Sequence, residues 1–493
     1  MRAIPATRGP RGAPPPPPPL AALLQSNALL DDAALAGATP LRADVLVLGG
    51  GGAGAAAALA AAGAGRQVIL ATKLRMGDSN TVMAEGGIQA AIGPEDSLQH
   101  HFDDTLRGGH NSADPHLVKQ LVTDGPAVIR WLIGLGMHFD LEKEAGLGAR
   151  LLRKKAGGTT VPRILSHRDV TGLEMMRVLR EAVELHPRIT VMNRCPAVEL
   201  LSDDAGACVG AVLYDLEHRR FLLLRSPAVI LATGGSGRLH LGGFPTSNHY
   251  GATADGLVLA YRMGARLRDL DSFQYHPTGV AWPAPLAGGL ISEAVRSAGA
   301  WLVNGHGQRF VDELLARDIV AAAILREIAE GRGVTRGGRV GVFLDTPGLL
   351  ARQPDLLETR LTGLKHLAHK AGFDPRREPF LVAPTLHYQN GGAVIDPQGE
   401  TTIPGLYAAG EVSGGVHGRN RLMGNALLEI ISFGRRAGAH AAARPVAAYS
   451  RGGIEHVHRW QRALAAAGLP RAPRAPLLYP DYAPFSLRQH AAA

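Results

Sequence analysis

The stretch DVLVLGGGGAGAAAALAAAGAGRQVILATK, residues Asp44–Lys73, decides the fold. Asp44–Leu48 is a short apolar run that predicts a buried strand, and the alanine-rich run after the glycines predicts a helix. Gln67–Ala71 predicts a second buried strand, so the stretch is expected to form a βαβ unit. Glycines between the strand and the helix allow the backbone to approach a pyrophosphate at the helix N-terminus. We expect three glycines of this turn to hold a dinucleotide: Gly49, Gly51 and Gly54.

The second strand ends without an acidic residue. It continues into Thr72 and Lys73, where an acid usually holds the ribose hydroxyl groups. Thr72 and the adjoining backbone, including Lys73, would have to replace that acid. This feature disfavours an ordinary NAD-dependent dehydrogenase and is compatible with FAD.

Two further glycine turns follow apolar strands much later in the chain, in Ala228–Gly235 and Gly405–Glu411. Their separation predicts a nucleotide-binding domain that an insertion interrupts at about residues 276–384. The first 40 residues include six consecutive prolines and predict a flexible extension. Residues 446–493 predict a short peripheral tail.

Composition excludes several classes of protein. The 493 residues carry a net charge of +9 and contain no compact Lys/Arg run, so we expect a solvated basic surface rather than nucleic-acid binding. A basic cleft for anionic substrates remains an alternative. No apolar run approaches the roughly 20 residues of a membrane span. The two cysteines, Cys195 and Cys208, are too few to ligate an iron–sulfur cluster. The chain is expected to be cytoplasmic, with electrons relayed by another chain.

No metal site is expected. His100 and His101 stand beside Asp103 and Asp104, as in a metal cluster, but this segment resembles an ordinary helix. His456 and His458 lie in the tail, where we expect both side chains to face solvent.

Seven motifs in order give the chain its family resemblance. They are SNTVMAEGG, TADG (Thr253–Gly256), QYHPTG, SEAVR, ARD, HYQNGG and VHGRNRLMGNALLE. The series resembles the flavoprotein subunits of succinate dehydrogenases and fumarate reductases, with L-aspartate oxidase as a close relative. The resemblance covers about residues 42–440. It implies an α/β fold in which a Rossmann-like FAD-binding domain (41–275 and 385–445) is interrupted by a smaller α+β capping domain (276–384).

The resemblance also implies roles for individual residues. Arg317 matches the family's proton-donating arginine, and Glu293 and Arg296 match the relay that reprotonates it. Four positions match the clamp for a C4 dicarboxylate: His276, Ser292, His387 and Arg421. Further positions match the FAD site: Ser79, Asn80, Thr81, Glu85, Gly86, Gly87, Asp255, Glu411, Asn425, Ala426 and Leu427.

Taken singly, several of these residues have simpler explanations. His276 and His387 would be hydrogen-bonded structural histidines, and Glu293 with Arg296 would be a helical ion pair. An arginine acid is also chemically demanding, because its pKa in water is above about 12. Nearby positive charge and desolvation would lower that pKa. We therefore expect Arg296 and Arg421 to converge on Arg317.

Departures from the family pattern refine the expected function. Many quinone-linked members carry a histidine that bonds covalently to the flavin where this chain has Asn80. We therefore expect non-covalent FAD and a preference for fumarate reduction. Aspartate oxidases carry an acid where this chain has Ala156, which disfavours an amino-acid substrate but keeps L-aspartate oxidase as the alternative.

The C-terminal region departs from the family as well. It is shorter than in members of membrane complexes, and Ala426 replaces the usual serine near the flavin ring. Docking to a standard iron–sulfur subunit is therefore uncertain, although an electron-transfer partner of some kind is expected. Membrane association through such partners stays open. A catalytically idle flavin-binding protein with an assembly role is a third alternative.

Overall fold

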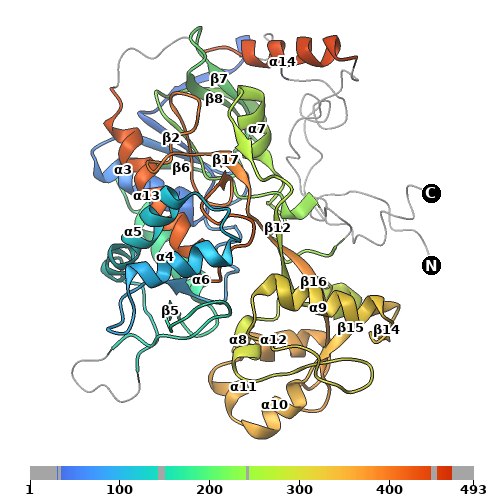
Figure 1. Cartoon of the computed structure of the whole chain (residues 1–493). Helices are drawn as coiled ribbons and strands as arrows, with labels where there is room; N and C mark the ends of the chain where they lie inside the picture. The colour runs from blue at the N-terminus through green and yellow to red at the C-terminus, as the bar shows by residue number, and fades with distance from the viewer. Residues whose placement is uncertain (1–29, 31–34, 143–149, 240–243, 446–451, 469–493) are drawn as a thin grey trace.

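A five-stranded parallel sheet forms the centre of the larger lobe in the computed structural model (Figure 1). Its order is β18-β10-β2-β3-β6, and all its strand pairs are parallel. The strands are Leu406–Ala408, Val229–Leu231, Val45–Leu48, Val68–Ala71 and Ile189–Met192, in that order. The structure describes residues 30, 35–142, 150–239, 244–445 and 452–468.

The predicted βαβ unit is confirmed. Strand β2 leads through the glycine turn into helix α3 (Gly52–Gly63), which returns the chain to β3 beside β2. The late glycine turns follow β10 and β18 of the same sheet. Turns more than 300 residues apart in the chain therefore lie together at the carboxyl ends of the strands. Parallel α/β sheets bind their ligands at this end.

Small residues let helix α13 (Asn425–Ala443) lie directly against α3. A Cβ atom on Gly434 would stand 2.6 Å from the Ala53 carbonyl oxygen, and one on Gly438 would stand 2.2 Å from that of Ala57. Neither position tolerates a side chain. The alanine run of α3 is thus explained by its burial between the sheet and α13.

Further elements surround the central sheet. A second sheet has the order β1-β9-β8-β7, a small one the order β11-β17-β19, and β4 pairs with β5. These strands are Thr39–Arg42, Arg220–Arg225, Cys208–Asp215, Ala197–Ser202, Leu267–Arg268, Gly392–Val394, Ser413–Gly414, Ile88–Gln89 and Ile164–Leu165. The helices are α4 (Leu98–Gly108), α5 (Pro115–Gly134), α6 (Thr171–Glu184), α7 (Asp255–Met263), α14 (Glu455–Ala466) and the 3-10 turn η1 (Gly237–Leu239).

The smaller lobe, here called the cap lobe, hangs from two long antiparallel strands (Figure 1). These are β12 (Phe273–Trp282) and β16 (Phe380–Gln389). The remaining strands are β13 (Leu302–Val303), β14 (Val334–Arg336) and β15 (Arg339–Leu344). Its helical segments are η3 (Ala284–Leu286), α8 (Glu293–Ser297), α9 (Arg317–Ala329), α10 (Thr346–Arg352), α11 (Leu356–Thr359) and α12 (Thr362–Ala371).

The cap lobe has a hydrophobic core of its own, which runs from Val280 to Val382 in sequence. It is an α+β unit whose chain enters and leaves the α/β lobe through β12 and β16. At the N-terminal side, β1 begins at Thr39 and pairs in parallel with β9. The proline run lies outside the described residues.

The prediction that His456 faces solvent is wrong. Its side chain is buried, with Nδ1 3.1 Å from Ser202 Oγ and Nε2 3.5 Å from Glu199 Oε1. Glu199 also forms a buried ion pair with Arg262, at 2.8 Å. Helix α14 covers this polar cluster, and the ring of Trp460 on this helix lies against the Arg262 guanidinium group. The charged appearance of the α14 sequence concealed its buried face.

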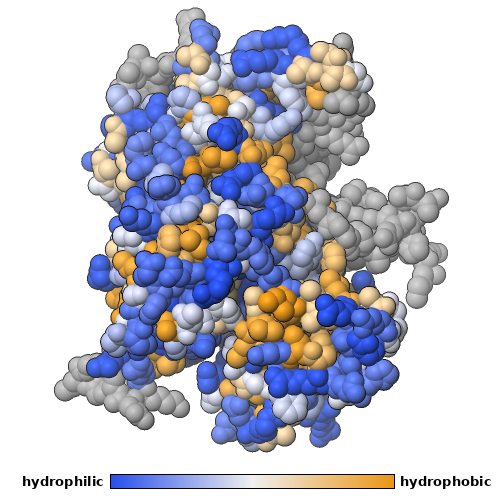
Figure 2. Space-filling view, in the orientation of Figure 1, coloured by the Kyte–Doolittle hydropathy of each residue, from blue (hydrophilic) through white to orange (hydrophobic). Residues whose placement is uncertain are grey.

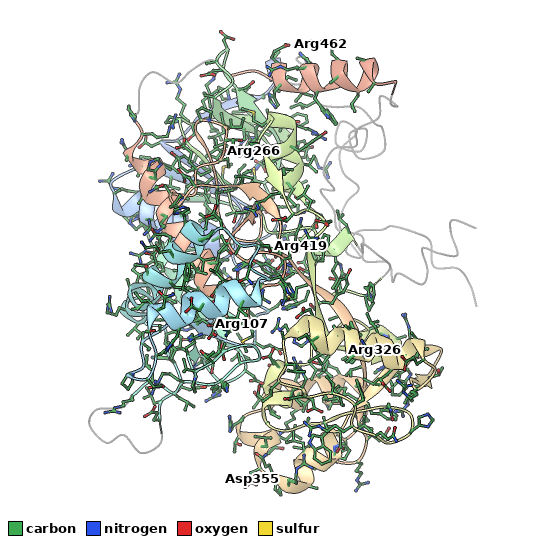
Figure 3. All side chains as sticks on the ribbon, in the orientation of Figure 1. Arg107, Arg266, Arg326, Asp355, Arg419 and Arg462 are labelled. Carbon is green, nitrogen blue, oxygen red and sulfur yellow. The ribbon has the colours of Figure 1, made fainter. Side chains whose placement is uncertain are left out.

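The face of the molecule drawn in Figure 2 is mostly hydrophilic. Figure 2 shows hydrophilic residues over both lobes, interrupted by small apolar patches. The labelled arginines of Figure 3 lie far apart, from α4 (Arg107) through the cap lobe (Arg326) to α14 (Arg462). Among the described residues, no helix combines the length and hydropathy needed to cross a bilayer, and no group of three or more potential ligands is arranged for a metal ion.

The buried Arg262–Glu199 pair yields a stability prediction. Replacing Arg262 by Ala leaves the buried Glu199 with His456 as its one remaining side-chain partner among the described residues, so the free energy of unfolding should fall by about 3–5 kcal/mol. Arg266→Ala, at an exposed position after the same helix, should change it by less than about 0.5 kcal/mol. Urea titration measures both. Equal effects of the two variants would contradict the importance of the pair.

Candidate functional site

One large cavity runs from the β2–α3 glycine turn to the cap lobe and has a volume of about 670 Å3. The larger lobe supplies the ends of β2 and β3, the loop 78–87, and the start of α13. The cap lobe supplies residues 289–293, Arg317 and one side of α12. The cavity therefore lies mostly in the larger lobe, and the cap lobe completes one end of it.

The glycine turn is shaped for close approach. Gly49 has a φ of +122°, and a Cβ atom there would stand 2.2 Å from the Ala232 carbonyl oxygen. Gly49 and Gly51 line the cavity at the N-terminus of α3. Gly54 does not line it, but a Cβ there would lie 1.9 Å from the Gly49 carbonyl oxygen. Gly54 thus allows α3 to pack against the turn, and the helix start is free to face an anionic group.

An acid does stand at the end of β3, but α7 provides it. Asp255 Oδ2 lies 2.8 Å from Lys73 Nζ, and its Oδ1 accepts a hydrogen bond from Thr253 Oγ1 at 2.6 Å. Asp255, Thr72 and Lys73 all line the cavity. The element that the βαβ sequence lacks is supplied by the TADG motif.

Asn80 is held on both sides of its amide. Its Nδ2 donates to Asn248 Oδ1 at 2.8 Å and to Glu411 Oε2 at 3.1 Å, and its Oδ1 accepts from the His249 N–H at 2.6 Å. Ser79, Thr81 and Glu411 also line the cavity. Burial raises the pKa of Glu411 above its usual value. The expected flavin loop is therefore fixed by contacts with two distant segments.

The second half of this loop and the start of α13 face each other across the cavity. Glu85, Gly86, Gly87, Ala426 and Leu427 line it, as expected. The Asn425 side chain does not line it.

Asn425 faces α4 instead. Its Nδ2 donates to Thr105 Oγ1 at 2.9 Å, and its Oδ1 lies 2.9 Å from His101 Nε2. The Asn425 side chain therefore fixes the start of α13 instead of touching the cofactor. The same contact gives the buried His101 ring a hydrogen-bonding partner. Burial lowers the pKa of His101 to about 4.

The expected proton relay is assembled in the cap lobe. Arg317 Nε donates to Glu293 Oε2 at 3.0 Å, and Arg296 Nη2 donates to the same oxygen at 3.4 Å. The Gly157 N–H donates to Glu293 Oε1 at 2.9 Å. Burial alone would raise the pKa of Glu293, but Arg317 and Arg296 outweigh it and lower the pKa. Glu293 is thus a buried carboxylate that the two guanidinium groups hold in its ionised form.

Gln274, which sequence reasoning missed, joins Arg317 to Arg421. Its Oε1 accepts from Arg317 Nη1 at 3.1 Å and from Arg421 Nη2 at 3.0 Å. Its Nε2 donates to Asn420 Oδ1 at 2.8 Å and to the Arg421 carbonyl oxygen at 2.6 Å. These four contacts use the full hydrogen-bonding capacity of the amide and define its orientation. Burial, assisted by the charge of Arg317, lowers the pKa of Arg421 to about 10.

Two histidines complete the wall opposite the arginines. The rings of His276 and His387 lie 5.4 Å apart, and burial followed by the charge of Arg317 holds both pKa values well below the usual range. The Thr278 N–H donates to His276 Nδ1 at 3.3 Å, which assigns the ring proton to Nε2. That Nε2 is buried and has no protein partner among the described residues. It is a neutral donor available to a ligand.

Ser292 lies at the N-terminus of α8, where its Oγ accepts from the Ala294 N–H at 3.3 Å. Ser292 and the other three residues predicted to form the clamp all line the cavity. Arg317 and Glu293 line it as well. Arg296 does not line it but forms an ion pair with Glu293. Gln274 could have been found from the sequence, because it is a polar residue in the QYHPTG segment, which forms part of the mostly buried strand β12. Tyr388, also missed, presents its ring to Arg421 at 4.6 Å.

Ala156 lies next to this relay. It is buried and directly precedes Gly157, whose N–H holds Glu293. Lys154, two residues before Ala156, forms an ion pair with Asp140, with Nζ 2.8 Å from Oδ2. The segment thus contributes no carboxylate to the cavity.

Comparison with known proteins identifies this arrangement. Residues 44–427 match the family model described as FAD binding domain. The fumarate reductase (CoM/CoB) of Methanothermobacter marburgensis contains a chain that is 42% identical over 76% of this chain and 68% of its own length. L-aspartate oxidase of Streptomyces coelicolor is 39% identical over 82% of this chain and 69% of its own length.

Solved structures agree with the sequence relatives. A quinol fumarate reductase of E. coli superposes with a TM-score of 0.78 and 31% identity, over 87% of this chain and 74% of that one. The glycine turn, the acid at the end of β3 and the fixed Asn80 loop fit a bound FAD. The chain is therefore an FAD-dependent oxidoreductase and belongs to the flavoprotein family of fumarate reductases, succinate dehydrogenases and L-aspartate oxidases.

Proposed function

We propose that this protein interconverts fumarate and succinate and favours fumarate reduction, with electrons from a separate redox partner. The observation that carries the proposal is the pair of guanidinium groups on Gln274 Oε1, backed by Glu293 and Arg296. Arg421 offers a buried guanidinium group to one carboxylate of a C4 dicarboxylate, and Arg317 stands beside it at the position of the proton donor. The electron-transfer partner is part of the proposal because two cysteines are too few to ligate an iron–sulfur cluster within this chain.

In this mechanism, FAD supplies the hydride chemistry when bound. Arg421 grips one carboxylate, and the neutral His276 and His387 donate hydrogen bonds to the substrate oxygens. Together they orient the double bond and polarise it. Arg317 gives a proton to the carbon that does not receive the hydride. Glu293, which is ionised at rest, takes up a proton from Arg296 and passes it to Arg317, and a proton from solvent then restores Arg296.

Electrostatics favour a dianion over an amino acid. Glu293 is held by two arginines, and Ala156 occupies the position where aspartate oxidases are expected to carry an acid. No free carboxylate is thus supplied at that position to meet an ammonium group. The identity to aspartate oxidases nevertheless keeps L-aspartate oxidation as the second candidate.

The function is tested by anaerobic assay of the flavin-loaded protein with reduced viologen and fumarate. Arg317→Ala should lower the rate by at least about a hundredfold, the usual contribution of a general acid. Arg326→Ala, on the exposed side of the same helix, should leave the rate unchanged. Peroxide formed from L-aspartate and oxygen would contradict the proposal and favour the oxidase. Bound flavin without activity in either assay, with and without a candidate redox partner, would favour an idle protein with an assembly role.

We further propose that FAD is held without a covalent bond, because Asn80 offers an amide where tethered relatives are expected to offer a histidine. Acid precipitation should therefore release all the flavin into the supernatant. Flavin fluorescence that stays with the protein band after denaturing electrophoresis would contradict this. His249, which lines the cavity and bonds to Asn80 through its N–H, would then be the first residue to replace.

Gln274 provides a further prediction. Gln274→Leu removes the acceptor shared by two buried guanidinium groups, a loss of about 1.5–3 kcal/mol. Fumarate kcat/KM should fall by about ten- to a hundredfold, measured by the same viologen assay. Gln398→Leu, at an exposed glutamine, serves as the control. An unchanged kcat/KM in Gln274→Leu would mean that the arginines hold their positions without it.

A further inference from the structure

A tight turn of the larger lobe reaches the proton relay from outside the cap lobe. It consists of residues 156–159, and Gly158 within it has a φ of +79°, which favours glycine. A Cβ atom on Gly157 would stand 3.0 Å from the Leu315 carbonyl oxygen and 3.4 Å from Glu293 Oε1. The turn therefore packs directly against the cap lobe, at the loop that precedes α9.

Thr159 closes this turn with its side chain. Its Oγ1 donates to the Ala156 carbonyl oxygen at 2.8 Å and accepts from the Ala156 N–H at 3.2 Å. Thr159 is buried, so water does not compete for these hydrogen bonds. The Ala156 carbonyl and the Gly157 N–H belong to one planar peptide group. By holding the carbonyl oxygen, the Thr159 hydroxyl therefore also fixes the direction of the Gly157 N–H.

The residue after the turn is anchored to helix α4. The Thr160 N–H and the Thr160 hydroxyl each donate to Asp104 Oδ2 at 2.9 Å. Arg163 Nη1 donates to the same oxygen at 2.6 Å, and both members of this ion pair are buried. The base of the turn is thus held by the larger lobe, independently of the cap lobe.

Glu293 uses its two oxygens for different partners. Its Oε1 accepts from the Gly157 N–H at 2.9 Å. Its Oε2 accepts from Arg317 Nε at 3.0 Å and from Arg296 Nη2 at 3.4 Å. Because the first oxygen is held by the turn, the carboxylate cannot rotate freely, and the second oxygen stays between the two guanidinium groups.

We propose that Thr159 is a positioning residue for the proton relay. Its hydroxyl directs the Gly157 N–H at Glu293, which keeps the carboxylate aligned with the two arginines of the relay. The turn and the relay belong to different lobes, so this alignment is complete only while the cap lobe is docked. Thr159 itself does not line the cavity. The inference rests on the proposed function, because it assumes that Glu293 passes a proton to Arg317.

The test compares fumarate reduction by the flavin-loaded wild type and Thr159→Val in the viologen assay. Valine keeps the shape of the side chain and removes the hydroxyl. We expect kcat to fall about tenfold, the effect of weakening one hydrogen bond to a charged group. The fumarate KM should stay unchanged, because the clamp is intact. The solvent isotope effect on kcat in heavy water should increase, since proton transfer then limits turnover.

Three further variants separate the hydroxyl from other effects. Thr159→Ser keeps the hydroxyl and should retain the wild-type kcat. Thr123→Val removes the hydroxyl of an exposed threonine on α5, which donates to the Lys119 carbonyl oxygen, and should retain all wild-type values. Gly157→Ala places a Cβ atom against the cap lobe and should lower kcat without raising KM. Gly157→Ala decides the question if Thr159→Val does not retain its flavin.

The outcomes are distinguishable. An unchanged kcat and isotope effect in flavin-loaded Thr159→Val would overturn the inference and leave the proposed function intact. A raised KM with an unchanged kcat would also overturn it, since the effect would then lie at the clamp. Equal losses in Thr159→Ser and Thr159→Val would exclude the hydroxyl as the cause. Absence of fumarate-dependent viologen oxidation by the wild type would overturn the proposed function and the inference with it.

Discussion

The active site depends on one neutral acceptor between two positive charges. Gln274 Oε1 accepts hydrogen bonds from Arg317 and Arg421, which would otherwise repel each other in a buried wall. An amide oxygen holds both groups without cancelling either charge, whereas a carboxylate would neutralise one of them. In the proposed reaction, the retained charge would attract a dianion. The carboxylate that the relay needs, Glu293, is placed behind Arg317, away from Arg421.

The two lobes are joined near the site by polar contacts. Gln274 and Asn420 belong to the strands and loops continuous with the larger lobe, whereas Arg317 and Asp318 open α9 of the cap lobe. Asp169 adds a third contact, from the larger lobe to α12. Such hydrogen bonds depend on geometry more strongly than apolar packing does. The acid, its relay and the clamp are therefore complete only when the lobes are docked, which couples the chemistry to the exclusion of water.

Much of this architecture can be predicted from the sequence. The features that sequence reasoning missed or misjudged have identifiable physical reasons. The βαβ unit, the interrupting lobe and the clamp residues follow local periodicity and motifs, which are properties of short segments. The contacts of Gln274 could not be predicted, because its partners lie on α9 and on the loop before α13, far away in the chain. His456 was misjudged because a charged helix conceals which face is buried. Asn425 stands in a cofactor motif, yet its side chain faces α4, since a motif does not specify side-chain direction.

The seam between α3 and α13 has an evolutionary consequence. Gly434 and Gly438 touch the backbone of α3 so closely that no larger residue fits, and the alanines opposite are equally confined. Any lineage that carries this fold is restricted there to the smallest side chains. The cap lobe has a separate core, so substitutions within it leave the seam between α3 and α13 untouched. The cap-lobe side chains that line the cavity can therefore vary without disturbing the packing of the nucleotide-holding half of the molecule.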